Sequence, residues 1–161
     1  KHGFLRDPWS SVLARPLEAD LVGISTITAT APGAYAIGDA LRARGIPVVF
    51  GGPHASFMPE EALEHGDYCI TGEGEQGLPL LAEALDGKRR LDEVPGLVWR
   101  EAGELRRNPP APPLEDLDSP DMECYARACT WLLGPGLTWC RVLGIRRKRV
   151  VSRVQSALLN F

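Results

Sequence analysis

Three short stretches of the sequence combine glycine or hydroxyl residues with a few reactive side chains: residues 25–30, 51–54 and 72–75. Glycine and short hydroxyl side chains let backbone N–H groups approach a large ligand closely. A single Gly-Gly or Gly-x-Gly more often only turns the chain. If the three stretches meet in space, however, they favour a binding site for a broad, polar ligand.

His54, Glu73 and Glu75 are the side chains of these stretches that could move protons or bind a metal. His54 has no second histidine or carboxylate at ligand spacing, which favours a polar role in a turn over a metal ligand or a general base. Glu73 and Glu75 could form an acid–base pair, but on a glycine loop that opens a helix they equally suit capping and interaction with the helix dipole. We therefore predict no catalytic residue and no metal ligand here.

The four cysteines show no regular spacing. Cys69, Cys124, Cys129 and Cys140 match neither a disulfide framework nor a zinc or iron–sulfur pattern, so free thiols are expected. The sequence also contains no signal peptide and no apolar run of membrane-spanning length. These features predict a cytoplasmic protein without a membrane span.

Each of the three stretches follows a short apolar run that is typical of a buried strand, at residues 20–25, 47–50 and 68–70. Helices are predicted from Pro32 to about Arg44, over residues 59–64, and in the segment that ends at residues 86–87. This alternation favours right-handed βαβ units and parallel strands. We predict an α/β fold: a three-layer, Rossmann-like (flavodoxin-like) parallel sheet with helices on both faces.

In such a sheet the carboxyl ends of all parallel strands lie at one edge, so the three stretches should converge there. Residues 96–100 and 104–107 flank a turn with Gly103 and predict a small β-hairpin beside the main sheet. The predicted domains are residues 1–107 for the α/β domain with its hairpin, 108–120 for a Pro-rich linker, and 121–161 for a basic tail of uncertain fold.

The charge is distributed unevenly along the chain. Residues 1–123 hold 11 basic and 21 acidic residues, a net charge of −10, whereas residues 124–161 hold seven basic and no acidic residues. A basic segment can bind nucleic acid or an anionic membrane. A shifted reading frame or a truncated gene would produce the same composition, so the sequence leaves the role of the tail open and nucleic acid is not the expected partner.

Four runs in a fixed order and spacing give the chain a specific resemblance. Residues 22–26, 51–55, 59–63 and 72–75 resemble the cobalamin (vitamin B12)-binding domain of radical S-adenosylmethionine proteins. The resemblance covers about residues 18–119 and implies a corrinoid lying across the carboxyl edge of the sheet. It implies the following cofactor-binding residues: Ser25, Thr26, Thr28, Gly51, Gly52, Pro53, His54, Gly72, Glu73 and Gly74.

Two departures from that family qualify the resemblance. The first strand and the Asp-x-His-x-x-Gly signature of methionine synthase-like domains are not found, so the expected cobalamin lacks a histidine ligand from these residues, and a preceding segment is expected in a larger protein. The Cys-x-x-x-Cys-x-x-Cys loop of the following barrel is absent as well. We therefore expect no 4Fe–4S cluster or S-adenosylmethionine site in this chain, and a radical S-adenosylmethionine barrel domain as its partner.

The resemblance thus predicts a cobalamin-binding module of a methyltransferase or cyclase-like parent enzyme, not catalytic as an isolated chain. Two alternatives stay open. One is a nucleotide-dependent α/β enzyme that uses the same carboxyl-edge crevice, although no Gly-x-Gly-x-x-Gly follows the first visible strand. The other is a degenerate remnant that binds no ligand.

Overall fold

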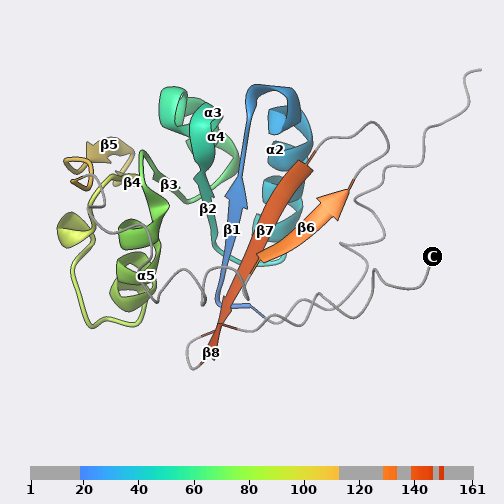
Figure 1. Ribbon diagram of the computed structural model, residues 1–161. Helices are drawn as coiled ribbons and strands as arrows, with labels where there is room; N and C mark the ends of the chain where they lie inside the picture. The colour runs from blue at the N-terminus through green and yellow to red at the C-terminus, as the bar shows by residue number, and fades with distance from the viewer. Residues whose placement is uncertain (1–18, 113–128, 134–138, 147–148, 151–161) are drawn as a thin grey trace, which may run out of the picture.

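The computed structural model describes residues 19–112, 129–133, 139–146 and 149–150 (Figure 1). These residues form an eight-stranded sheet with the order β5-β4-β3-β2-β1-β7-β6, and β8 pairs with β7. The strands are β1 (Leu21–Ser25), β2 (Val48–Gly51), β3 (Tyr68–Ile70), β4 (Leu97–Glu101), β5 (Glu104–Arg107), β6 (Cys129–Leu133), β7 (Trp139–Arg146) and β8 (Arg149–Val150). The helices are η1 (Thr28–Thr30), α2 (Ala31–Arg42), α3 (Gly52–Phe57), α4 (Pro59–His65), α5 (Gly74–Leu85) and η2 (Leu91–Glu93).

The three strands predicted to be parallel are parallel. β1 pairs with β2 from Val22 opposite Val48 to Ser25 opposite Gly51, and β2 pairs in the same direction with β3. The predicted hairpin is confirmed as β4 and β5. This hairpin extends the sheet, because β4 pairs with β3, in the antiparallel direction. On the other side, β7 runs antiparallel to β1.

Helices cover both faces of the sheet, which confirms the predicted three-layer architecture. Alternate residues of each strand point to opposite faces. One cluster joins strand residues such as Val22 and Phe50 to α2, α3 and α4. The second joins Val49 and Ile70 to Leu78 and Leu81 of α5. Figure 1 shows α5 set apart from α2, α3 and α4.

One local prediction was wrong. The sequence predicts a strand-end loop at residues 51–54, but Gly51 still belongs to β2 and Gly52 begins α3. A helix starts there because Pro53, which lacks an N–H donor, lies in the first turn, where the N–H groups have no intrahelical acceptor. The helix α2 ends at Arg42, close to the predicted end at about Arg44. The N–H of Arg44 bonds the carbonyl of Leu41 and tightens the last turn.

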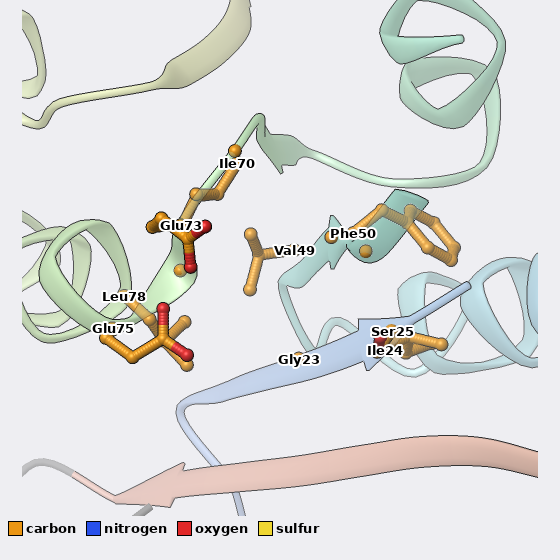
Figure 2. Close-up of a pocket in the computed structure, with 13 residues that line it drawn as sticks. Gly23, Ile24, Ser25, Val49, Phe50, Ile70, Glu73, Glu75 and Leu78 are labelled. Carbon is orange, nitrogen blue, oxygen red and sulfur yellow. The ribbon is translucent and has the colours of Figure 1, made fainter. Parts of the chain in front are cut away.

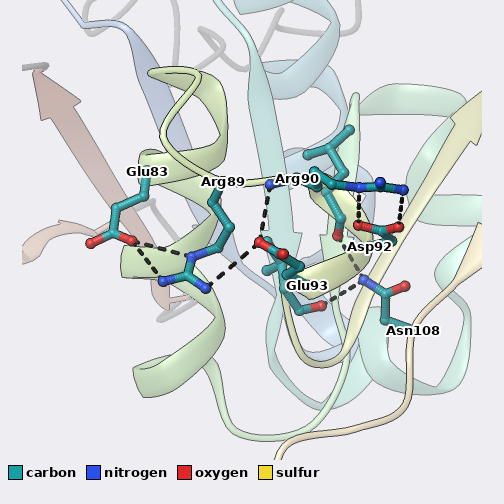
Figure 3. A network of polar contacts seen from close by, with 8 residues as sticks. Glu83, Arg89, Arg90, Asp92, Glu93 and Asn108 are labelled. Atoms are coloured by element: carbon teal, nitrogen blue, oxygen red, sulfur yellow. Dashed lines mark hydrogen bonds and ion pairs between the residues drawn. The ribbon is translucent and has the colours of Figure 1, made fainter.

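A polar network holds the connection between α5 and β4 (Figure 3). Arg89 donates from Nε and Nη2 to Glu83 Oε2, both at 3.2 Å. Nδ2 of Asn108 donates to the carbonyls of Leu91 and Val94, each at 2.7 Å. The first pair of bonds ties the residues after α5 to that helix, and the second pair ties η2 and Val94 to the segment after β5.

The proposed domain division stays a prediction. Residue 108, where the Pro-rich linker was predicted to begin, is tied to the domain through Asn108, and the Gly96 N–H donates to the Pro109 carbonyl at 2.7 Å. Residues 113–120 of the predicted linker lie outside the described residues. Of the predicted tail, the structure describes only the strands β6, β7 and β8.

Candidate functional site

A cavity of about 190 Å³ lies at the carboxyl ends of β1, β2 and β3, on the face covered by α5 (Figure 2). All three sequence stretches contribute to it, so the predicted convergence is confirmed. Its lining residues are Gly23, Ile24, Ser25, Val49, Phe50, Gly51, Gly52, Ile70, Gly72, Glu73, Gly74, Glu75 and Leu78.

Small residues at the ends of the strands make this space. Val49 and Gly51 point to the α5 face because they alternate with Phe50, which packs on the other face. A Cβ built on Gly51 would meet only the Ile70 carbonyl oxygen, at 3.7 Å, which is an ordinary contact distance. Apolar walls come from Val49, Ile70 and Leu78. The lack of a side chain at Gly51 therefore leaves the α5 face open at the carboxyl end of β2.

Gly52 allows β2 to turn sharply into α3 beside the end of β1. Its φ is +86°, in the left-handed region, and a Cβ there would lie 2.7 Å from Ser25 Oγ and 2.8 Å from the Thr26 carbonyl oxygen. Two backbone hydrogen bonds hold the end of β1 against the start of α3. The Thr26 N–H donates to the Gly51 carbonyl at 2.8 Å, and the His54 N–H donates to the Thr26 carbonyl at 3.1 Å. No larger residue fits at position 52 without a backbone shift.

The third side of the cavity is the start of α5. Gly72 has a φ of +78°, and its N–H donates to Ser56 Oγ at 3.1 Å, which ties the loop before α5 to α3. Glu73 occupies the N-cap position of α5 without a side-chain capping bond. The first-turn N–H groups of α5 thus face the mouth of the cavity without a side-chain cap, a setting that suits a ligand acceptor.

Two carboxylates border the cavity, and Figure 2 shows both directed toward it. Glu73 is exposed, so water can hydrate its carboxylate. Glu75 is half-buried, and its Oε2 atom is buried with no hydrogen-bond partner in the part of the chain that the structure describes. A buried carboxylate oxygen without a donor is costly, so Glu75 suits a ligand that supplies a donor.

Six of the ten predicted cofactor-binding residues line the cavity and four do not. The six are Ser25, Gly51, Gly52, Gly72, Glu73 and Gly74. Thr26, Thr28, Pro53 and His54 lie outside the lining. Whether the six contact the cofactor stays a prediction.

His54 is turned toward the helices of the opposite face. Its side chain is 11% exposed, its Nδ1 lies 3.2 Å from Thr28 Oγ1, and its Nε2 lies 3.6 Å from Glu61 Oε1. The hydroxyl of the buried Thr26 donates to the Gly51 carbonyl at 3.2 Å. These side chains hold the strand-end loops together beside the cavity.

The sequence reasoning missed several lining residues. Gly23, Val49 and Ile70 belong to strands, and the alternation of the strands was the signal that could have found them. Leu78 lies on the apolar face of α5, where helical spacing was the signal. Glu75 was considered only as half of an acid–base pair. Its buried oxygen depends on how α5 packs, which no local pattern encodes.

Other titratable groups lie away from the cavity. Burial raises the pKa of Cys69 to about 12, and its Sγ donates to the Ala55 carbonyl at 3.4 Å. Burial, with the negative charge of Glu61, also raises the pKa of Tyr35, whose ring stacks on His65 with centroids 4.5 Å apart. Within the described ranges, no group of three or more His, Cys, Asp or Glu side chains could hold a metal ion. No helix among these residues is long and apolar enough to cross a membrane.

The residues that line the cavity lie within a stretch of the chain that matches a known family. Residues 11–82 match the model of the B12-binding domain. The chain carries a B12-binding domain. The match supports cobalamin as the cofactor, as the sequence predicted. The residues present fit it in two respects: Gly51 leaves open a space that a side chain would fill, and Glu75 offers an acceptor without a donor.

Curated relatives of the B12-binding domain are methyltransferases. The chain is 30% identical over 118 residues to an uncharacterized methyltransferase of Pyrococcus horikoshii. The aligned region covers 70% of this chain and 26% of that protein. It is 37% identical over 99 residues to the bacteriochlorophyllide d C-8(2)-methyltransferase of Chlorobaculum tepidum, covering 62% of this chain and 20% of that protein.

Solved structures agree with this assignment. The radical S-adenosylmethionine methyltransferase TsrM of Kitasatospora setae, solved with cobalamin and a 4Fe–4S cluster, superimposes with a TM-score of 0.56 and 27% identity, covering 72% of this chain and 23% of that one. The cobalamin-dependent enzyme OxsB, at 24% identity and a TM-score of 0.51, shares the fold. The chain thus spans about a quarter of the length of the first of these relatives.

Proposed function

We propose that this chain holds cobalamin for a radical S-adenosylmethionine methyltransferase, with the catalytic barrel as a separate domain or partner. The observation that carries the proposal is the cavity beneath the carboxyl ends of β1, β2 and β3, within a matched B12-binding domain. Curated relatives named as methyltransferases and a cobalamin-bound radical S-adenosylmethionine methyltransferase support the choice of parent enzyme.

The dimensions of the cavity indicate which part of cobalamin it takes. An apolar cavity of about 150 Å³ accommodates a benzene ring. The cavity of about 190 Å³ therefore suits a flat heterocyclic base and is far too small for a corrin macrocycle. In this proposal the base of the nucleotide tail enters between β2 and α5, and the macrocycle lies outside, across the carboxyl edge.

The chain's own residues have three tasks in this arrangement. Val49, Ile70 and Leu78 exclude water from the buried base. Gly51 and Gly52 let backbone approach the ligand, because a side chain at either position would occupy the cavity or collide with β1. Bound cobalamin supplies a redox-active cobalt centre, which the domain presents to chemistry that takes place elsewhere.

Exposed apolar side chains lie near the same edge. Ile27, which follows β1, is 50% exposed, and Phe57 and Met58 at the end of α3 are 85% and 46% exposed. Large apolar side chains of this exposure are suited to contact with a macrocycle or an adjoining domain. The barrel domain predicted from the resemblance remains our proposal for that neighbour.

The test is a titration of the purified chain with hydroxocobalamin, followed by gel filtration and a visible absorption spectrum of the protein peak. We expect equimolar cobalamin in the wild-type peak. Gly51→Leu should abolish retention because its side chain fills the cavity, whereas Gly51→Ala should retain most of it. Far-UV circular dichroism of each variant checks that the fold is intact.

A folded wild-type chain that retains no cobalamin at saturation would contradict the proposal. The same columns run with NADH separate the remaining alternatives, since retention of the dinucleotide would favour a nucleotide-dependent enzyme. Retention of neither compound would favour a remnant that binds no ligand.

A further inference from the structure

Glu75 has a feature that cobalamin binding in general does not explain. Its Oε2 atom is buried at the edge of the cavity and has no hydrogen-bond donor among the residues that the structure describes. Such an atom loses its hydration without compensation, and native proteins rarely leave it so unless a ligand or water completes the site. The missing group must therefore be a hydrogen-bond donor.

We propose that Glu75 accepts a hydrogen bond from a ribose hydroxyl of the cobalamin nucleotide tail, and that it selects corrinoids with a complete tail over those without one. This inference rests on the function proposed above. It adds a specificity-determining residue to the site, and it assigns to Glu75 a role in cofactor choice rather than in acid–base chemistry.

The position of Glu75 restricts which part of the cofactor can reach it. The first turn of α5 places its carboxylate beside the cavity, next to the apolar wall formed by Leu78. A base that fills the space between β2 and α5 brings the attached ribose to the same wall, because the sugar is bonded directly to the base. The amide groups of cobalamin are attached to the macrocycle, which is too large to enter.

Charge excludes the other polar group of the tail. The phosphodiester is an anion and offers no donor, and Glu73 and Glu75 both direct carboxylates toward the cavity. Like charges at short range repel, so the phosphate has to lie away from Glu75. A ribose hydroxyl is neutral and can donate, and a hydroxyl-to-carboxylate bond is among the stronger hydrogen bonds in proteins.

Glu73 provides a matched control. It is the same residue type, lines the same cavity and lies two positions away, but its side chain is exposed and can be hydrated by solvent. If the effect of Glu75 came only from negative charge near the cavity, a change at Glu73 would reproduce it. If the effect comes from the buried acceptor, only a change at Glu75 will alter the preference for cobalamin over cobinamide.

The experiment measures the affinity of wild-type chain, Glu75→Met, Glu75→Gln and Glu73→Met for hydroxocobalamin and for cobinamide, which lacks the nucleotide. We expect Glu75→Met to weaken cobalamin binding by about 10- to 100-fold, the range for a hydrogen bond to a charged group, and to leave cobinamide binding unchanged. Glu75→Gln keeps a neutral acceptor and should lose less. Glu73→Met should leave the ratio of the cobalamin affinity to the cobinamide affinity unchanged.

Thermal unfolding of the ligand-free variants provides a second readout. Glu75→Met should be as stable as the wild type or more stable, since it replaces an unpartnered carboxylate with an apolar side chain of similar length. Loss of cobalamin affinity together with retained stability supports the proposal, whereas a loss that accompanies unfolding overturns it.

The remaining outcomes are distinguishable. Equal weakening toward cobalamin and cobinamide in Glu75→Met, or an unchanged cobalamin affinity in that variant, would overturn the role of Glu75. The same change of the cobalamin-to-cobinamide ratio in Glu73→Met would overturn it as well. A wild-type chain that binds both corrinoids equally would also overturn it while leaving cobalamin binding intact. A folded wild-type chain that binds neither would refute the proposed function itself.

Discussion

Gly38 and Gly51, which lie on opposite faces of the sheet, have opposite effects. On the face covered by α2 and α4, a Cβ on Gly38 would lie 2.8 Å from the Phe50 ring, and one on Gly66 would lie 2.6 Å from it. On the α5 face, a Cβ on Gly51 would meet nothing closer than 3.7 Å. Gly38 and Gly66 bring backbone against an aromatic ring, whereas Gly51 keeps space for a ligand.

The alternation of β2 produces both results from adjacent residues. Phe50 is completely buried on the face covered by α2 and α4, which we call the closed face. Val49 and Gly51 point to the α5 face, which contains the cavity. Lower on the α5 face the packing is also complete, since Leu81, Val94 and Leu97 are fully buried. The comparison teaches that the site arises from a local omission of side chains at one corner, next to residues that are fully buried on both faces.

Removing the central ring of the closed face should have the largest effect. Phe50→Ala should lower the free energy of unfolding by about 3–5 kcal/mol, because a large side chain leaves a cavity that its neighbours cannot fill. Val49→Ala should cost less, since Val49 borders space that is already open. Urea unfolding followed by circular dichroism measures both, and a Val49→Ala variant as unstable as Phe50→Ala would contradict the contrast.

Adding a methyl group should separate the two kinds of glycine directly. Gly38→Ala should destabilise the domain by about 1–3 kcal/mol, as overpacking does, because its Cβ would lie 2.6 Å from the His65 carbonyl oxygen. Gly51→Ala should stay within about 1 kcal/mol of the wild type, since its extended backbone suits any residue. Thermal unfolding of the two variants decides the matter; equal destabilisation would refute the distinction.

The stability of the domain should depend on pH in the alkaline range, because Cys69 is buried in the closed face. Burial keeps the Cys69 thiol protonated to about pH 12, against an ordinary pKa of 9.0. The folded state therefore binds a proton that the unfolded state releases, and this contribution is full below pH 9 and is lost as the pH rises toward 12. Cys69→Val lacks the thiol, so its stability should fall less than that of the wild type between roughly pH 8.5 and 10.5, the window that linkage sets. The measurement is the unfolding free energy of both proteins at each pH. Parallel curves would argue against a buried thiol.

The smallest effects should come from the ion pairs at the base of α5. Arg89→Ala should lower stability by less than about 1 kcal/mol, because its pairs with Glu83 and Glu93 are partly exposed. Asn108→Ala should cost more, about 1–3 kcal/mol, since it leaves two carbonyls without their short bonds. Denaturant titrations rank the two, and a reversed order would show that the ion pairs, rather than Asn108, hold the α5 connection.

Local patterns were sufficient for the regular elements around the site. The apolar run of residues 68–70 became β3 with the predicted bounds, and the residues around Gly103 became a hairpin. The start of α3 was missed, because Gly51-Gly52-Pro53 reads locally as a break and becomes a helix only where Gly52 fits against Thr26. The orientation of His54 was equally hidden, since it depends on Glu61 of another helix.

By itself the sequence determined the alternation of β1, β2 and β3 with α2, α4 and α5, the edge at which the three glycine-rich stretches meet, and the family through which the cofactor could be named. The first two properties follow from short-range apolar periodicity and from glycine positions. The family follows from the resemblance of four runs in their order and spacing. Only the tertiary structure decided that the cavity opens on the α5 face, that His54 turns away from it, and that one oxygen of Glu75 is buried without a donor. Burial and orientation depend on contacts between residues far apart in the chain, and no local pattern contains those contacts.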